Sequence, residues 1–271
     1  MAIRLVAMDL DGTLVDSRRN VSEYTKKVIA KYATLGVAFA FCSGRVDNEM
    51  DSVYAALPEV KYAILANGAY GLELPARTRI FANSLSPDKV RQIRATYAKY
   101  DHMFEIMLGP RVYSDANCLG RPEDYGAEYL GDVLARTRTP VDDMSVFVRD
   151  LTESADKVNI FFTSPQEQLK MIEIAAGLGT DFTHPERTNV EFTARGVNKG
   201  SGLKFLAETL GISPDEIMAI GDNNNDLTML EYAVHSVAMG NSDDSIKKIA
   251  RYVTDTNDND GAAKAIERII G

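Results

Sequence analysis

Short runs of apolar residues recur along the chain, and several of them end abruptly in polar residues. Residues 5–8, 37–41 and 217–220 are apolar without alternation, which is typical of strands buried on both faces of a sheet. Between the first two runs, Ser22 can cap a helix that Gly36 would end. A strand, a helix and another strand in this order predict a right-handed parallel crossover. The pattern therefore predicts an α/β protein with a Rossmann-like parallel sheet.

The same kinds of signal predict further strands and helices. An apolar run at residues 62–65 leads into Asn67-Gly68 and a second, alternating run, and Asn-Gly between such runs predicts a hairpin. Nearer the end of the chain, Asn198 precedes a helix that Gly211 would close. We also expect strands at 234–239 and 251–254 and a last helix at 261–270.

The character of the chain changes between the hairpin and the later helices. Ser86-Pro87 and Ser164-Pro165 both resemble helix starts, with serine as the cap and proline in the first turn. Between them, residues 145–148 and 158–162 predict strands. We therefore expect a core domain and a smaller α/β domain inserted into it, with the core formed by residues 1–82 and 189–271 and the insertion by residues 83–188.

The charge of the chain excludes two classes of partner. Its 271 residues include 30 Lys and Arg against 39 Asp and Glu, a formal net charge of −9. Nucleic acid and anionic membrane surfaces both need clustered positive charge, and no basic run is present. The longest apolar stretch, residues 37–42, is far too short to span a membrane, and the first residues lack a signal-peptide core. With Cys42 and Cys118 as its two thiols, the sequence predicts a soluble cytoplasmic protein, either a monomer or a homodimer.

Three polar clusters each follow directly on a predicted buried strand. They are Asp9-Leu10-Asp11-Gly12-Thr13, Ser43-Gly44-Arg45, and Gly221-Asp222 through Asp226. In open parallel sheets, ligands bind at the carboxyl ends of the strands, near the point where the strand order reverses. Parallel strands would place all three clusters along one edge, so residues dispersed in the sequence would converge in space.

Four carboxylates would crowd together at this edge, those of Asp9, Asp11, Asp222 and Asp226. Like charges this close raise each other's pKa unless a cation lies between them. A cluster that offers only oxygen ligands, without the spacing of a calcium loop, favours Mg2+.

Groups that suit a phosphate accompany the carboxylates. Ser43 offers a hydroxyl, and Gly12 and Gly44 permit close approach of the backbone. Lys199 lies at the start of a predicted helix, whose dipole favours anions. Carboxylates, a hard cation and anion donors together indicate phosphoryl transfer.

The order of these motifs resembles that of the haloacid dehalogenase superfamily. Asp9-Leu10-Asp11-Gly12-Thr13-Leu14, Ser43, Lys199 and Gly221-Asp222-x-x-Asn225-Asp226 look like its four motifs in sequence order. The long insertion between Ser43 and Lys199 is similar to the Cof-type subgroup, whose cap domain enters there, and so is the closing Asp258-x-Asp260-Gly261. Ser43 stands where threonine is common in the family, and either hydroxyl would serve.

The resemblance implies a phosphatase and gives each matching residue a role. Asp9 would be the nucleophile and form an aspartyl-phosphate, and Asp11 would act first as the acid and then as the base. Mg2+ would be held by Asp9, Asp222 and the backbone carbonyl of Asp11, with Asp226 orienting these ligands. The phosphoryl oxygens would be bound by the remaining set, Ser43, Gly44, Lys199, Asn225 and Gly12.

Two further residues are candidates for contact with the substrate. Arg45 could reach the phosphate or could form a surface ion pair. Asn67 could touch the substrate, although the hairpin turn already explains an asparagine at this position.

The substrate expected from this family resemblance is a small phosphorylated metabolite, such as a sugar phosphate. A phosphomutase of the phosphomannomutase type is an alternative, because it shares the paired aspartates and a related cap. It would need convergent arginines, and the insertion contains Arg111, Arg121, Arg136, Arg138 and Arg149. A non-catalytic sensor of a phosphorylated metabolite is the second alternative, although it would not need to retain both Asp9 and Asp11.

Overall fold

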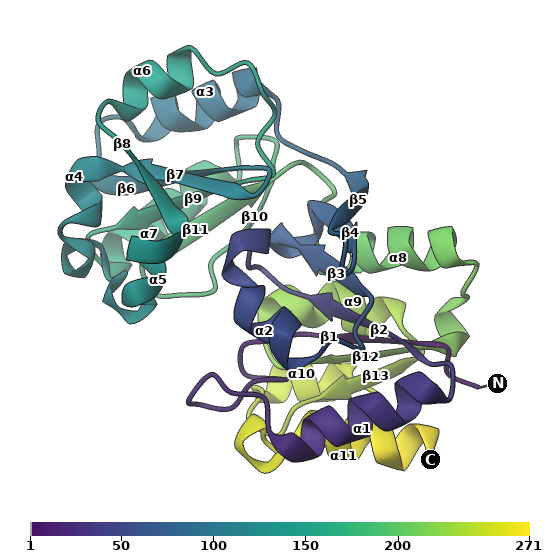
Figure 1. Ribbon diagram of the computed structural model, residues 1–271. Coiled ribbons are helices and arrows are strands. Elements are labelled where there is room, and N and C mark those ends of the chain that lie inside the picture. Colours follow the sequence, from purple (N-terminus) through teal and green to yellow (C-terminus); the bar gives the residue numbers. More distant parts are fainter. Residues whose placement is uncertain (1) are drawn as a thin grey trace. The chain divides into compact units, whose positions relative to one another are not determined.

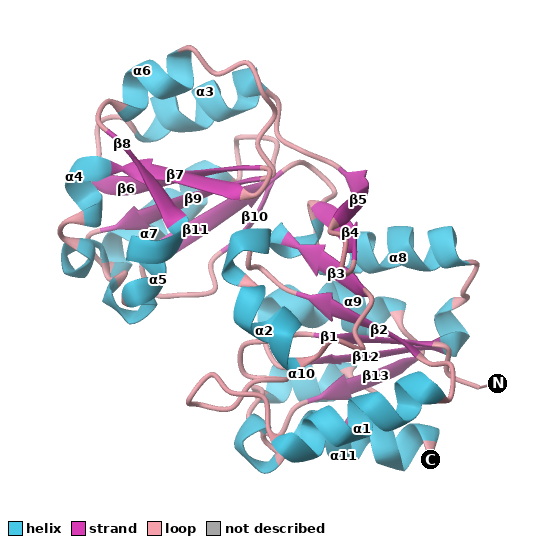
Figure 2. Ribbon diagram, viewed as in Figure 1, coloured by secondary structure: helices cyan, strands magenta, loops and turns pink. Residues whose placement is uncertain are grey.

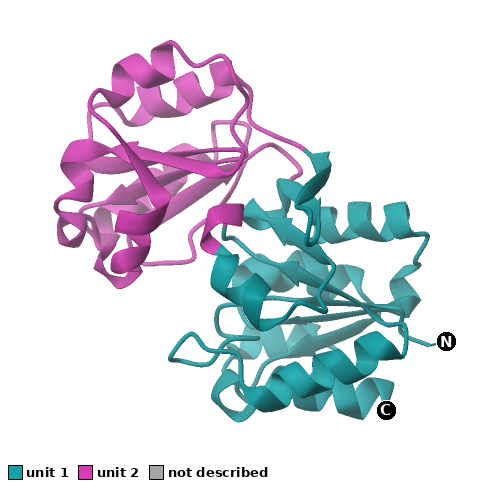
Figure 3. Ribbon diagram, in the orientation of Figure 1, with its two compact units in different colours: residues 1–45, 50–82, 198–271 teal, residues 46–49, 83–197 magenta. Residues whose placement is uncertain are grey.

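The computed structural model describes residues 2–271, which form two compact units (Figure 3). Unit 1 comprises the chain up to Arg45 together with Met50–Ala82 and Asn198–Gly271. Unit 2 comprises Val46–Glu49 and Asn83–Val197. None of the helices in residues 2–271 is both long and apolar enough to cross a membrane.

The described part of unit 1 is built on a sheet of eight strands in the order β14-β13-β12-β1-β2-β3-β4-β5. The first six in this order run parallel to one another, β4 is antiparallel to β3, and β5 is antiparallel to β4. The strands are β1 (Leu5–Met8), β2 (Ala38–Cys42), β3 (Tyr62–Leu65), β4 (Tyr70–Glu73), β5 (Thr78–Ala82), β12 (Ile217–Gly221), β13 (His235–Ala238) and β14 (Tyr252–Val253). The predicted parallel-sheet α/β core is confirmed.

Helices cover both faces of this sheet. Two of them, α1 (Glu23–Thr34) and α11 (Gly261–Ile270), pack together on one face (Figure 1). The other face is covered by α8 (Lys199–Leu210), α9 (Leu227–Tyr232) and α10 (Asp244–Ile249), whose leucines and isoleucines form a core with residues of β1, β2 and β12. The short helix α2 (Asp51–Ala56) precedes β3. Because both faces are covered, the central strands are apolar without alternation, as the sequence indicated.

The helix boundaries follow from capping residues that the sequence shows. The side chain of Ser22 accepts the backbone N–H of Thr25 at the start of α1, and Asn198 accepts that of Ser201 at the start of α8. Gly211 ends α8 in the left-handed conformation, with φ +62°. The predicted hairpin is present as β3 and β4, joined by a single helical turn at Ala66–Gly68.

The described residues of unit 2 form a sheet of six strands in the order β10-β11-β9-β6-β7-β8, antiparallel except for β7 and β8. The strands are β6 (His102–Leu108), β7 (Arg111–Asp115), β8 (Arg138–Val141), β9 (Lys157–Phe162), β10 (Asp181–Thr183) and β11 (Asn189–Thr193). The helices are α3 (Pro87–Tyr97), α4 (Ala116–Leu119), α5 (Asp132–Thr137), α6 (Met144–Arg149) and α7 (Pro165–Ala175), drawn in cyan in Figure 2. One face of the sheet packs against α3, α6 and α7 in a single apolar core.

One predicted element of unit 2 has the wrong type. Residues 145–148 were expected to form a strand because valine and phenylalanine favour strands, but they lie in α6. Asp143 caps this helix by accepting the backbone N–H groups of Ser145 and Val146 at 2.9 and 3.0 Å. Met144 and Val148, four residues apart, are the buried positions, which is a helical spacing.

The chain also returns to unit 1 later than the sequence suggested. The expected return at residue 189 falls too early, because β11 pairs with β9 and β10 in the sheet of unit 2. The last residue of unit 2 is Val197. Apolar residues of β11 resemble those of the core strands, so the sequence pattern could not assign this strand to one sheet or the other.

The second face of the unit 2 sheet carries buried charges that neutralise one another. Arg138 is 8% exposed and donates to Glu105 through two hydrogen bonds of 2.8 and 3.0 Å, and it also pairs with Glu49. Burial acts to raise the pKa of Glu49, but the positive charges of Arg138 and Lys157 and the hydrogen bonds from Arg138 and the Val46 backbone together outweigh it, and the pKa lies below its ordinary value. Removing the guanidinium would therefore leave two carboxylates buried without their counter-charge.

We expect Arg138→Ala to lower the free energy of unfolding by about 3–5 kcal/mol, since it breaks a buried ion pair from one side. The matched control is Arg121→Ala, which removes an ion pair with Asp124 whose side chains are 58% and 47% exposed. That change should cost less than about 1 kcal/mol. Urea denaturation followed by circular dichroism measures both, and equal small losses would show that the buried network contributes no more than a surface pair.

Candidate active site

The carboxyl ends of β1 and β12 meet where the strand order of unit 1 reverses. From β1 the chain proceeds outward through β2 and β3, and after unit 2 it proceeds outward in the other direction from β12. Met8 lies opposite Ile220, and the backbone N–H of Asp9 donates to the carbonyl of Ile220 at 3.0 Å. This reversal point is where ligands bind in open α/β sheets, and the polar clusters after β1, β2 and β12 all lie at its edge.

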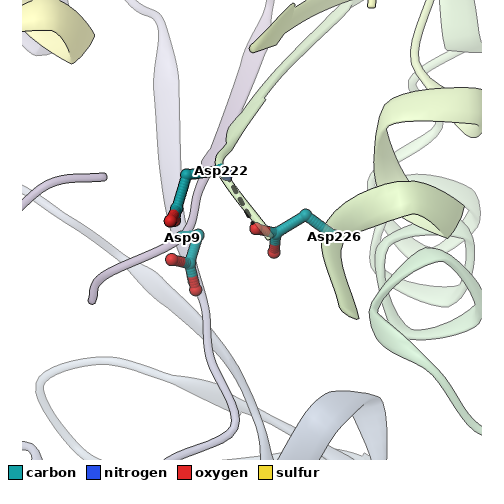
Figure 4. Close-up of side chains that lie close together, drawn as sticks. All are labelled: Asp9, Asp222 and Asp226. Carbon is teal, nitrogen blue, oxygen red and sulfur yellow. Dashed lines mark hydrogen bonds between the residues drawn. The ribbon is translucent and has the colours of Figure 1, made fainter. Parts of the chain in front are cut away.

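Three aspartates gather at this point. Asp9 follows β1, Asp222 follows β12, and Asp226 ends a short turn of helix at Asn224–Asp226 (Figure 4). One carboxylate oxygen from each lies within 4.8 Å of one from each of the others. Asp226 is held from within its own loop, because its Oδ2 accepts the backbone N–H groups of Asp222 and Asn223 at 2.9 and 3.0 Å.

Lys199, the first residue of α8, lies between two of these aspartates. Its Nζ is 2.5 Å from Oδ1 of Asp9 and 2.6 Å from Oδ1 of Asp226, and its side chain is 1% exposed. Burial acts to lower the pKa of Lys199, but the two carboxylates outweigh it and raise the pKa above its ordinary value. Lys199 is therefore a fixed positive charge within the aspartate cluster.

A single ammonium does not neutralise three carboxylates, of which Asp9 and Asp226 are buried and Asp222 is half-buried. Burial raises the pKa of Asp9 well above its ordinary value, and the charges of Asp226 and Asp222 raise it further against the opposing effect of Lys199. Burial and the charge of Asp226 likewise raise the pKa of Asp222, to about 6. A cation placed among these oxygens would remove the repulsion. The donor set consists of hard oxygen ligands, so the residues present fit Mg2+.

The loop after Asp9 packs directly against Asp222. Thr13 donates from its hydroxyl to Oδ1 of Asp222 at 2.9 Å. Gly12 has φ +86°, and a Cβ at this position would lie 2.4 Å from Oδ2 of Asp222. Only glycine satisfies both the backbone conformation and this close approach.

Asp11 lies outside the buried cluster. Its side chain is 53% exposed, and it accepts two hydrogen bonds from the guanidinium of Arg45, at 2.8 Å from Nε and 2.5 Å from the terminal nitrogen. Arg45 thus forms an ion pair with Asp11, and its contact with a substrate stays a prediction.

The remaining candidates form a second group around the loop after β2. Ser43 is buried, and its hydroxyl accepts the backbone N–H of Arg45 at 3.1 Å. Asn67 donates its backbone N–H to the carbonyl of Ser43 at 3.0 Å and accepts a weak hydrogen bond of 3.4 Å from the Asn225 side chain. A Cβ on Gly44 would lie 2.9 Å from Oδ1 of Asn67, so the two loops are in close contact. Asn67 has φ +56° in the hairpin turn, which accounts for its residue type.

Two residues at this edge were not assigned a role from the sequence. Thr13 lies inside the first polar cluster, but its bond to Asp222 depends on the fold. Asn241 comes three residues after β13, and its Nδ2 donates to the carbonyl of Gly12 at 2.8 Å. The rule that selected the other clusters, a polar residue just after a parallel strand, would have selected Asn241 as well.

Comparisons with known proteins support the same interpretation of the site. Residues 6–266 match the family model described as haloacid dehalogenase-like hydrolase. The chain is 28% identical over 296 residues to phosphatase YwpJ of Bacillus subtilis, covering 99% of this chain and 100% of that protein. It is 30% identical over 278 residues to pyridoxal phosphate phosphatase YbhA of Escherichia coli, covering 98% of each.

A solved structure agrees with these sequence relatives. The crystal structure of a haloacid dehalogenase-like hydrolase from Bacteroides thetaiotaomicron has a TM-score of 0.85 and 25% identity, covering 98% of this chain and 99% of that one. The family model matches nearly the whole chain, and this match agrees with the arrangement of Asp9, Lys199, Asp222 and Asp226 in the structure. The chain therefore belongs to the haloacid dehalogenase-like hydrolases, as its motifs predicted.

Proposed function

We propose that the chain is a Mg2+-dependent phosphatase that hydrolyses small phosphate monoesters through an aspartyl-phosphate on Asp9. The observation that carries the proposal is the cluster of Asp9, Asp222 and Asp226, in which the buried Asp9 and Asp226 both pair with the ammonium of Lys199. Such a cluster suits a bound cation and, beside it, an anionic substrate. The phosphatases among its relatives support the same reaction class.

The first chemical step is attack by Asp9 on the phosphorus atom. A carboxylate oxygen of Asp9 forms a bond to phosphorus as the bond from phosphorus to the ester oxygen breaks, which leaves an acyl phosphate and an alcohol. Lys199 orients Asp9 by holding its Oδ1 at 2.5 Å. Precise orientation of the nucleophile is a large part of what an enzyme contributes to phosphoryl transfer.

Asp11 would move the protons in both steps. It would protonate the departing alkoxide, and as the resulting carboxylate it would accept a proton from the water that attacks the acyl phosphate. In the structure the Asp11 carboxylate is held by Arg45, whose terminal nitrogen lies 2.5 Å from Oδ1 of Asp11. A substrate phosphate would offer Arg45 another anion, and transfer of Arg45 to the phosphate would release Asp11 for the first step.

The remaining site residues would bind the metal and the phosphate. Mg2+ would be held by Asp9, Asp222 and the backbone carbonyl of Asp11, with Asp226 orienting them through its contacts to Lys199 and the Asp222 backbone. When bound, the ion would neutralise charge on the phosphoryl oxygens. Those oxygens would be contacted by the phosphate-binding set, Ser43, Lys199, Asn225 and the backbone at Gly12 and Gly44.

Unit 2 would act as the cap that selects the substrate. We expect a small phosphorylated metabolite, and sugar phosphates are the first class to test. Because the relative from Escherichia coli is named for pyridoxal phosphate, that compound belongs in the same panel.

A phosphomutase is less well supported. Three of the five arginines considered for rebinding a bisphosphate already pair with carboxylates: Arg121 with Asp124, Arg138 with Glu105 and Glu49, and Arg149 with Asp150. The sensor alternative differs from both enzymes in a simple observation, since it would bind a phosphate ester without releasing phosphate.

We expect release of inorganic phosphate from p-nitrophenyl phosphate or from the metabolite panel to be lost entirely in Asp9→Asn. In Asp11→Asn, kcat should fall by about 10²- to 10⁴-fold, because proton transfer is impaired while the nucleophile remains. Folded wild-type protein that binds a panel member without releasing phosphate would favour the sensor. Conversion between isomeric sugar phosphates would favour the mutase.

Removal of divalent metal with EDTA should abolish turnover, and added Mg2+ should restore it. Loss of a residue that only supports the metal ligands costs roughly 10- to 100-fold in metal affinity. Because Asp222 is proposed as a ligand itself, Asp222→Asn should raise the Mg2+ concentration for half-maximal activity by at least this factor. Asp215→Asn is the matched control, because Asp215 lies at the opposite, amino end of β12 and should leave this concentration unchanged. An activity that is insensitive to EDTA, or equal metal requirements in the two variants, would contradict the proposed metal site.

A further inference from the structure

The loop that carries Asp11 is held from outside by two segments near the end of the chain. This loop, residues 10–17, receives contacts from Asn241 after β13 and from Asn257 and Asp258 after β14. Nδ2 of Asn241 donates to the carbonyl of Gly12 at 2.8 Å, and Nδ2 of Asn257 donates to the carbonyl of Val15 at 3.0 Å. Asp258 accepts the backbone N–H of Ser17 at 2.7 Å. The loop is therefore tied at three positions along its length.

Inside the loop, the backbone is tightly folded. The carbonyl of Leu10 accepts three backbone N–H groups, those of Thr13, Leu14 and Val15, at 3.0–3.2 Å. The carbonyl of Gly12 is bonded by the Asn241 side chain, and it lies in the peptide group between Gly12 and Thr13, one residue beyond Asp11. A side chain that holds this carbonyl acts on the orientation of Asp11.

Asn241 is itself held in place relative to the buried aspartates. The segment before it is bonded to β12, since the N–H of Met239 donates to the carbonyl of Gly221 at 3.0 Å. Its own Oδ1 accepts the backbone N–H of Asn257 at 3.1 Å. Asn241 thus connects the strand end that precedes Asp222 with the loop that carries Asp11.

The two bonds of Asn241 require a carboxamide. One atom donates to a carbonyl while the other accepts an N–H, and among side chains of this length only asparagine offers both. Asn241→Asp would keep the shape and the acceptor but would lose the donor that faces Gly12.

We propose that Asn241, supported by Asn257, is a positioning residue that holds Asp11 where it can protonate the leaving group. This inference rests on the proposed phosphatase function. It assigns Asn241 no contact with the substrate. Its effect is on the geometry of proton transfer, and a misplacement of about 1 Å in such a geometry can cost on the order of 100-fold in rate.

The test compares two aryl esters that differ in their need for a proton. Phenyl phosphate releases phenoxide, which resembles tyrosinate in basicity, and the pKa of the corresponding phenol is about 10. The nitro group of p-nitrophenyl phosphate makes its leaving group much less basic. The quantity to measure is kcat/KM, because it covers the steps up to departure of the alcohol and excludes the later hydrolysis of the acyl phosphate. Asp11→Asn is the reference for complete loss of the acid.

We expect Asn241→Ala and Asn241→Asp to lower kcat/KM roughly 10- to 100-fold for phenyl phosphate. For p-nitrophenyl phosphate the loss should stay within about 3-fold, since little proton transfer is needed. Asn257→Ala should show the same selectivity with a smaller loss. Asn259→Ala is the matched control, because Asn259 is an exposed asparagine on the same C-terminal loop whose side chain donates a hydrogen bond to the nearby Thr256 hydroxyl. This substitution should leave kcat/KM unchanged for both esters.

The outcomes separate this inference from the function on which it rests. Equal losses with both esters, or no loss beyond that of Asn259→Ala, would overturn the positioning role while the wild-type enzyme remains active. A melting temperature lowered in Asn241→Ala with equal losses would show a structural role alone. A wild-type enzyme inactive on both esters and on the metabolite panel would overturn the proposed function and this inference with it.

Discussion

The contact on which the site depends is that of Lys199 with Asp9 and Asp226. Burying carboxylates is costly unless they are paired, and here a buried ammonium lies within 2.6 Å of two of them. This pairing permits the Asp9 carboxylate, the proposed nucleophile, to be nearly excluded from water. Burial, together with the negative charge that stays unbalanced, raises the pKa of Asp9 and Asp222 and makes the cluster a suitable place for a cation.

The fold supplies the conditions for that contact. Neighbouring parallel strands, β1 and β12, bring Asp9 and Asp222 together although more than 200 residues separate them in the chain, and α8 presents Lys199 at its first turn. Glycines allow the polar groups to approach. A Cβ on Gly12 would meet the carboxylate of Asp222, and a Cβ on Gly221 would lie 2.6 Å from that of Asp226. The site therefore depends on the backbone at these positions as much as on its charged side chains.

Much of this arrangement could be predicted because the signals are local. Buried strands, capping residues and polar residues just after strands are all visible in the sequence, and they indicated the parallel sheet and the family. The errors arose where the outcome depends on tertiary packing. The apolar pattern of residues 145–148 did not reveal the helical spacing of the buried residues Met144 and Val148, and the pattern of β11 did not reveal which sheet it joins. The ion pair of Asp11 with Arg45 and the bond of Asn241 to Gly12 join residues 34 and 229 positions apart, which a single sequence cannot show.

The central claim is that Asp9 becomes phosphorylated during turnover, and chemical trapping tests it most directly. The enzyme is mixed with substrate and Mg2+, quenched in acid and reduced with borohydride, which converts an aspartyl-phosphate into homoserine, and the peptides are then mapped by mass spectrometry. We expect homoserine at position 9 only when substrate is present. Phosphate release with Asp9 unmodified, or reduction at another aspartate, would contradict the mechanism proposed for this site.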